Sequence, residues 1–321
     1  MLVLPARAVP LAPPLSATQL GLVVNDEDPN SVAAAKMYQA AHGVPDANIA
    51  HVRIANRPRK LSAAAFDKLK QEIDAQFAPG IRAVLMLWTA PYAVECNAIT
   101  AAYSLGYDAA QCDQPCGPGK PSTYFDAQPG PPPMRISMLL PTDTLSLTKE
   151  VIEHGSSKSF LLPKAGAYFL VTSDTARSSR ARNFPRSGRI AARDLTVQTL
   201  YTDVLENVNG IILYQTGLVR VPKLETLGFL PGALADHLTS TGGDLLSNNQ
   251  MSILRWLEAG ATASYGTVSE PCNHWQKFPH SSVLLKHYMN GDTAIEAYWK
   301  SVAWPAQGLF VGDPLAAPYR R

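Results

Sequence analysis

The sequence has no long hydrophobic run and no marked excess of charge. None of its 321 residues lies in an apolar stretch of the roughly 18 to 20 residues that a membrane-spanning helix needs, so we expect no membrane span. The 28 basic and 26 acidic residues leave a formal charge of +2, which is too small to indicate a nucleic-acid partner. A hydrophobic content of 46% is instead typical of a globular protein with a substantial core.

The chain also lacks the motifs of common nucleotide and zinc sites. It contains neither a Walker loop nor a G-x-G-x-x-G motif, so nothing supports a nucleotide cofactor. Its four cysteines form no C-x2-C pair, which argues against zinc. Their even number favours disulfides made in an oxidising compartment, and the Pro/Gly-rich loop around Cys112 and Cys116 would accommodate a local one. Free buried thiols are the main alternative.

The N-terminus lacks the basic and hydrophobic regions of an intact signal peptide. Residues 1–19 are apolar, rich in Pro and Ala, and contain Ala6-Arg7-Ala8, so they would be the remnant of a signal peptide if the natural start lies upstream. We therefore expect an exported protein, periplasmic or extracellular. Residues 20–321 are expected to form a single α/β domain with a Pro/Gly-rich insertion at about 97–162.

Short apolar, β-branched runs bounded by turn residues predict the strands. Most are apolar at successive positions, which is typical of parallel strands covered on both faces. Their alternation with helical patterns predicts a three-layer α/β sandwich with a mostly parallel sheet. The expected strands are 20–24, 49–54, 83–89, 167–172, 211–216, 261–268 and 309–311, and the expected helices are 31–42, 62–77, 191–206, 245–259, 281–289 and 293–302.

Ligands of open parallel sheets bind beyond the carboxyl ends of the strands. We therefore expect binding residues where the predicted strands end, several of them converging on one edge of the sheet, above all between Ser264 and His280. His237 is predicted on a helix, where neighbouring Asp236 would point away from it, so helix capping or a place at the core edge is the alternative. Ser264 weakly matches a nucleophile elbow, with a strand residue as the alternative. The expected binding residues are Asn25, Asp26, Thr89, Tyr92, Thr216, Ser264 and His237.

Two charged segments have both a ligand-binding and a structural interpretation. The carboxylates of Asp26 and Asp28 would suit calcium, but acidic residues before a helix are also typical N-caps. The stretch from Arg177 to Arg193 holds six arginines among Ser, Asn, Pro and Gly, a composition typical of a solvated loop, with an anionic partner as the alternative.

Cys272 and His274 form the clearest candidate for nucleophilic chemistry. A cysteine nucleophile needs a nearby base or cation, and side chains two apart on an extended segment point the same way. In the alternative interpretation Cys272 is disulfide-bonded, for example to Cys96, and His274 lies on a surface loop.

Several longer motifs resemble an uncharacterised bacterial family of exported proteins, over nearly the whole chain. They include the segments 209–217, 235–240, 260–272 and 308–315 and, near the N-terminus, 23–28 and 94–96. More distantly, the element order and Gly312-Asp313-Pro314 resemble the gingipain branch of caspase-like cysteine peptidases. That resemblance implies a caspase-like fold with a catalytic His-Gly after one strand and a Cys after the next. Here the strand that ends at Thr216-Gly217 has no His where the peptidases would place one, and the following segment 228–232 has no Cys.

Two functions follow from the resemblance. The first is an exported hydrolase of amide, ester or lactone bonds, acting on a small-molecule or peptide substrate through Cys272, His274, Glu270 and Glu95. The second is a catalytically inactive relative that recognises a protein or a glycan at the strand ends. A disulfide at Cys272 would favour the second.

Overall fold

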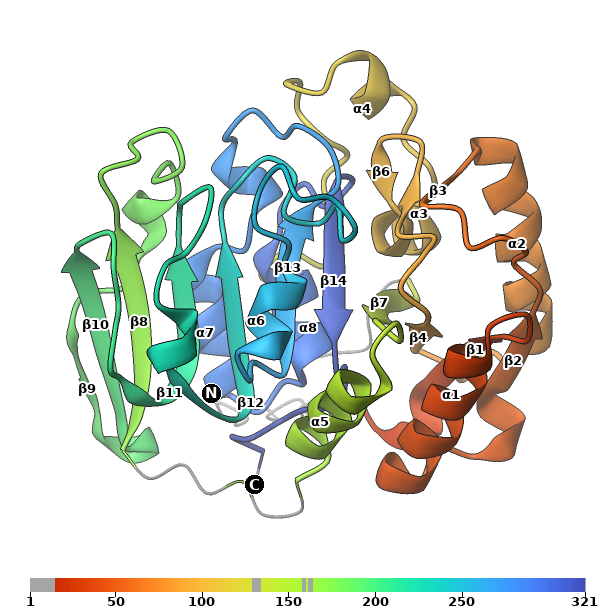
Figure 1. Ribbon diagram of the computed structural model, residues 1–321, viewed down its shortest axis with the longest axis horizontal. Coiled ribbons are helices and arrows are strands. Elements are labelled where there is room, and N and C mark those ends of the chain that lie inside the picture. Colours follow the sequence, from red (N-terminus) through yellow and green to blue (C-terminus); the bar gives the residue numbers. More distant parts are fainter. Residues whose placement is uncertain (1–14, 129–133, 158–159, 161–163, 321) are drawn as a thin grey trace, which may run out of the picture.

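The computed structural model describes residues 15–128, 134–157, 160 and 164–320, so residues 1–14 of the expected N-terminal segment lie outside it. The structure confirms the three-layer α/β architecture. An eleven-stranded, mostly parallel sheet has the order β2-β1-β4-β7-β14-β13-β12-β11-β8-β10-β9, and a small second sheet has the order β3-β5-β6. Helices α1, α5 and α6 cover one face of the large sheet, and α7 and α8 lie behind it (Figure 1).

The strands are β1 (Leu20–Asn25), β2 (Ile49–Val52), β3 (Lys60–Leu61), β4 (Ala83–Leu87), β5 (Ala93–Val94), β6 (Asn97–Ala98), β7 (Ile136–Leu140), β8 (Ala165–Val171), β9 (Gly188–Ile190), β10 (Leu195–Tyr201), β11 (Asn209–Thr216), β12 (Gly228–His237), β13 (Ala263–Thr267) and β14 (Gly308–Gly312). The helices are α1 (Pro29–His42), α2 (Ala63–Gln76), α3 (Ile99–Leu105), α4 (Ala110–Asp113), α5 (Leu145–Gly155), α6 (Leu254–Glu258), α7 (Ser281–Met289) and α8 (Ala294–Ser301). No helix among these is long and apolar enough to span a membrane.

Apart from β9, which pairs antiparallel with β10, the large sheet consists of two parallel halves that run in opposite directions. Strands β2, β1, β4, β7 and β14 are parallel to one another, and so are β13, β12, β11, β8 and β10. The halves meet where β13 pairs antiparallel with β14, and their arrowheads point opposite ways in Figure 1. The carboxyl ends of the strands therefore lie at two edges. We call them the β8–β13 edge, where β8, β10, β11, β12 and β13 end, and the β1–β7 edge, where β1, β4, β7 and β14 end.

The central strands are apolar because both of their faces are covered. Every residue of β4, β7 and β14 is buried, and the indole side chains of Trp88, Trp256 and Trp299 are completely enclosed. Side-chain caps begin three of the helices: Asp28 caps α1, Ser62 caps α2, and Thr293 with Glu296 forms a capping box at α8.

Several sequence expectations about the elements were wrong. Of the expected helix 245–259, only α6 (Leu254–Glu258) is helical. Residues 195–201, expected inside a helix, form β10, and residues 228–237, not assigned to a strand, form the central strand β12. The segment 97–162 is not a single insertion, because it contains β7, which pairs with β4 and β14 in the middle of the sheet. Between β6 and β7, the stretch around α4 lies beyond the end of the sheet in Figure 1; we call residues 106–120 the cap segment.

Candidate functional site

The reversal of the sheet separates residues that the sequence placed at one edge. Thr216 and His237 end β11 and β12 at the β8–β13 edge. Asn25 ends β1, and Thr89 follows β4, at the opposite β1–β7 edge. Ser264 lies at neither edge: it pairs with Val311 inside the sheet and is fully buried, and its Oγ has no hydrogen-bond partner among the described residues. The expectation of one convergent site is therefore wrong.

The predicted residues at the β1–β7 edge already serve the fold. The amide of Asn25 bonds the backbone of Ile54, and the Thr89 hydroxyl accepts the backbone N–H groups of Thr142 and Asp143. These bonds hold the loops beyond β1 and β4.

The two carboxylates suggested for calcium have separate protein partners. Asp26 pairs with His51 at 2.7 Å, whereas Asp28 caps α1 and faces Arg57 at 3.4 Å. No group of three or more His, Cys, Asp or Glu side chains that could hold a metal occurs in the described ranges. The capping alternative accounts for Asp28, and the calcium expectation has no support from the geometry.

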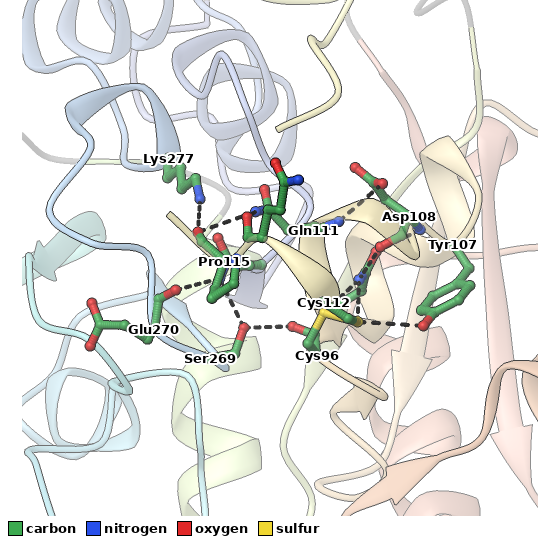
Figure 2. Close-up of a disulfide and its surroundings, with 12 residues drawn as sticks. Cys96, Tyr107, Asp108, Gln111, Cys112, Pro115, Ser269, Glu270 and Lys277 are labelled. Carbon is green, nitrogen blue, oxygen red and sulfur yellow. Dashed lines mark hydrogen bonds between the residues drawn. A yellow bond between two sulfur atoms is a disulfide. The ribbon is translucent and has the colours of Figure 1, made fainter. Parts of the chain in front are cut away.

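All four cysteines are paired, and the pairing differs from both expected ones. Cys96 is bonded to Cys112, and Cys116 is bonded to Cys272. The local Cys112–Cys116 bridge and the Cys96–Cys272 bridge are therefore wrong. The bond between Cys116 and Cys272 joins the cap segment to the segment that follows β13, whereas the bond between Cys96 and Cys112 joins it to the turn between β5 and β6 (Figure 2). The sulfur of Cys272 carries no thiolate in this state, so its assignment as a nucleophile is wrong for the oxidised protein.

The proposed partners of Cys272 are engaged in holding the same junction. His274 Nε2 lies 2.8 Å from the carbonyl oxygen of Cys116, and the carboxylate of Glu270 accepts the backbone N–H of Cys272 at 2.7 Å. Ser269 donates to the carbonyl oxygen of Cys96 (Figure 2). The Gln307 amide donates to Ser269 and to the carbonyl of Glu270. The segment that the sequence singled out is thus the anchor of the cap segment.

The other two predicted residues near the cap segment do not complete a catalytic pair. Glu95 is exposed and has a left-handed backbone conformation. Burial is the main cause that raises the pKa of Tyr107, and the negative charge of Glu95 raises it further. Tyr92 donates its hydroxyl to Asp244. None of the hydrogen bonds of the seven histidines, all of which are described, has a serine, threonine or cysteine side chain as its partner.

His237 is a strand residue, so the expected helix at this position is wrong. Successive side chains of a strand point to opposite faces. Asp236 faces Arg180, whereas the Nδ1 atom of His237 accepts the indole N–H of Trp256 at 2.9 Å. Burial lowers the pKa of His237 to about 3, and the nearby charge of Arg180 acts in the same direction. His237 is therefore a neutral core residue at neutral pH.

The buried imidazole predicts a pH dependence of stability. The pKa of His237 is lower in the folded chain, about 3, than its ordinary value of 6.5, so the unfolded state binds more protons between these values. The contribution of neutral His237 to the free energy of unfolding is therefore fully present above pH 6.5 and is lost as the pH falls from there toward about 3. We expect His237 to lower the free energy of unfolding by about 2 kcal/mol between about pH 7 and about pH 5. Urea unfolding of the wild type and of His237→Gln, which can still accept from Trp256, measures it; equal pH dependences would contradict the expectation.

An arginine-rich segment stands beyond the carboxyl end of β8. We call residues 172–187, between β8 and β9, the arginine loop; it lies above the arrowhead of β8 in Figure 1. The Thr172 hydroxyl donates to the carbonyl of Gly217, and Arg177 Nε donates to Thr239 Oγ1. A Cβ at Gly217 would collide with the backbone of Arg177, so glycine permits this close approach. The loop is thus fixed on the β8–β13 edge and is not the freely solvated segment that its composition indicates.

Arg180 provides the deepest attachment of this loop. Its side chain is fully buried, pairs with Asp236, and donates to the carbonyl oxygen of Thr216 at 2.8 Å. Gln215 donates to the other oxygen of Asp236 at 2.8 Å. Burial raises the pKa of Asp236, and the charge of Arg180 is the strongest opposing influence. The pair ties the arginine loop to the ends of two central strands.

A cavity of about 520 Å³ opens between the arginine loop and the end of β10. Its walls include Phe184, Ser187 and Thr199, together with Arg182, Arg186 and Tyr201, and contain no acidic residue. We call it the arginine pocket. Tyr201 is 86% exposed, the largest value among the exposed large hydrophobic side chains of the described chain.

The six arginines of this region fall into two groups, those with a partner side chain and those without one. Four of them have one: Arg177 pairs with Asp174, Arg180 with Asp236 and Arg189 with Asp194, and Arg193 lies over the ring of Tyr319. Arg182 and Arg186 have no carboxylate partner in the described part of the chain, and these two line the arginine pocket. The two arginines of this region that have neither a carboxylate nor an aromatic partner among the described residues therefore line the same cavity.

Sequence reasoning did not select this pocket, although a signal was available. No Asp or Glu lies between Asp174 and Asp194, so the run of arginines has few local partners. The signal was incomplete because Tyr201 was expected on a helix, where its position beside the loop could not be anticipated.

Comparison with known proteins adds no relative: no family model, curated protein or solved structure matches the chain. The resemblance to caspase-like peptidases stays a prediction.

Proposed function

We propose that the chain is an exported, non-catalytic binding protein that recognises an anionic partner, a protein or a glycan, through the arginine pocket. The observation that carries the proposal is the placement of the two unpaired arginines, Arg182 and Arg186, around one cavity at a strand-end edge. Guanidinium groups bind carboxylates and sulfates through paired hydrogen bonds, and strand ends are the usual ligand-binding edge of such sheets. The two disulfides support export, because such bonds persist in oxidising compartments.

Hydrolysis through Cys272 has less support. The sulfur is bonded to Cys116, the imidazole of His274 lies on a backbone carbonyl, and Glu270 holds the backbone N–H of Cys272. A broad screen with ester, amide and lactone substrates tests this alternative. Hydrolysis that is lost in His274→Ala and in Glu95→Gln would contradict the binding proposal.

Removing the two unpaired charges should weaken binding selectively. We expect Arg182→Gln/Arg186→Gln to bind immobilised dextran sulfate or polyglutamate at least about tenfold more weakly than the wild type, because charge-assisted hydrogen bonds are lost. Binding should also weaken as salt rises, since the two side chains are exposed. Surface plasmon resonance, with uncharged dextran as the reference surface, measures both effects.

Arg189→Gln is the matched control. It removes the same charge from the same region, but Arg189 is paired with Asp194 and lies outside the arginine pocket. The control should bind as the wild type does. A double variant with wild-type affinity, or an equal loss in Arg189→Gln, would show that binding does not depend on the pocket.

A further inference from the structure

We infer that the partner of the arginine pocket is an acidic polysaccharide, which rests on the anion-binding function proposed above. Three features of the pocket carry the inference. An exposed aromatic ring lies beside the arginines, two unpaired charges line one cavity, and the backbone of β10 next to the pocket is already hydrogen-bonded, so a peptide strand cannot pair with it.

Tyr201 gives the pocket an apolar face next to its charges. The residue ends β10 and borders the cavity, yet 86% of it is exposed. An aromatic ring that the core does not use is a ready surface for stacking. The C–H face of a pyranose ring fits such a surface, and Phe184 adds a second, half-buried aromatic wall.

The two arginines supply the complementary charge. Arg182 and Arg186 belong to the same loop, and the buried pair of Arg180 and Asp236 fixes that loop on the sheet. Their guanidinium groups present planar sets of donors that suit the carboxylate of a uronic acid or a sulfate ester. An acidic sugar can therefore place its ring on Tyr201 and its anionic group at the arginines.

The backbone of β10 beside the pocket is not free to pair with an added peptide strand. The backbone N–H of Thr199 in β10 donates to Ser187 Oγ at 2.9 Å, and the same hydroxyl lies 3.4 Å from the Thr199 carbonyl oxygen. The Thr199 hydroxyl donates to the carbonyl of Pro185 at 2.6 Å. The first two of these bonds occupy the backbone groups of Thr199 that an extended acidic peptide would use for strand addition, and the third holds the loop in front of them.

The test compares the binding of sugar, peptide and nucleotide anions to the full-length protein. The probes are a short oligogalacturonate, its methyl-esterified form, a sulfated dextran oligomer, a glutamate oligomer and a single-stranded oligonucleotide, with calorimetric titration as the measurement. We expect the oligogalacturonate or the sulfated oligomer to bind, and the esterified, uncharged form not to bind. The relative affinities of the two sugars distinguish a carboxylate from a sulfate as the recognised group.

Variants of Tyr201 separate a sugar from other anions. Tyr201→Ala should weaken saccharide binding by about tenfold, whereas Tyr201→Phe, which keeps the ring, should bind within about twofold of the wild type. Because Tyr201 is exposed, its loss should leave the thermal unfolding midpoint unchanged.

Three outcomes would overturn the inference. Tighter binding of the glutamate oligomer, unaffected by Tyr201→Ala, would leave the anion-binding function standing but identify an acidic peptide. Tighter binding of a single-stranded oligonucleotide, which also uses arginine and aromatic stacking, would identify a nucleic acid. Binding of none of these anions would contradict both the inference and the proposed function.

Discussion

Replacing Arg180 with methionine is expected to lower the free energy of unfolding by about 3–5 kcal/mol. The side chain is completely buried and pairs with Asp236, whose carboxylate is also held by Gln215. Methionine fills much of the volume but leaves a buried carboxylate without its counter-ion. Urea denaturation at neutral pH measures the loss. Because Asp236 can then take up a proton, the loss should shrink as the pH falls.

The exposed pair of Arg189 and Asp194 provides the comparison. Its N–O distance is 2.8 Å, but the two side chains are 68% and 50% exposed. Arg189→Met should therefore change the free energy of unfolding by at most about 1 kcal/mol. A loss for Arg180→Met as small as this would show that the buried pair does not anchor the arginine loop.

Removing the disulfide between Cys116 and Cys272 should have an effect of similar size. The cysteines are 156 residues apart, so the bond greatly restricts the unfolded chain, and the chain-entropy relation gives about 5 kcal/mol for the loss. The bridge between Cys96 and Cys112 spans only 16 residues, for which the same relation gives about 3 kcal/mol. We expect Cys116→Ser/Cys272→Ser to unfold at lower urea concentration than Cys96→Ser/Cys112→Ser.

Thiol titration tests the pairing itself. The native protein should give no reaction with a thiol reagent before reduction, since all four cysteines are bonded. Peptide mapping without reduction should recover Cys116 linked to Cys272. A reactive Cys272 in the native protein, or equal stability losses in the two double variants, would contradict the assignment and restore the thiol as a candidate nucleophile.

The sequence predicted the layered architecture because its strong signals are local. Continuous apolar runs such as Ala83–Leu87 indicate buried parallel strands, and Asp28 and Ser62 mark helix starts by their capping chemistry. β12 was missed because Pro231 and Gly232 interrupt its pattern, although tertiary pairing with β11 and β13 overrides that weakness.

The candidate site was less predictable because it depends on contacts between distant segments. The antiparallel pairing of β13 and β14 decides which strand ends share an edge, and no local pattern encodes it. The cysteine spacing left the disulfide partners open, and Arg182 and Arg186 could be distinguished from their four neighbours only once each partner was known.

The most direct measurement is the position of a bound anion in a crystal of the full chain soaked with a short oligogalacturonate or sulfated oligomer. We predict density in the arginine pocket, with the anionic group at Arg182 and Arg186 and a sugar ring on Tyr201. Ordered ligand at the junction of Cys116, Cys272 and His274, with an empty arginine pocket, would contradict this account.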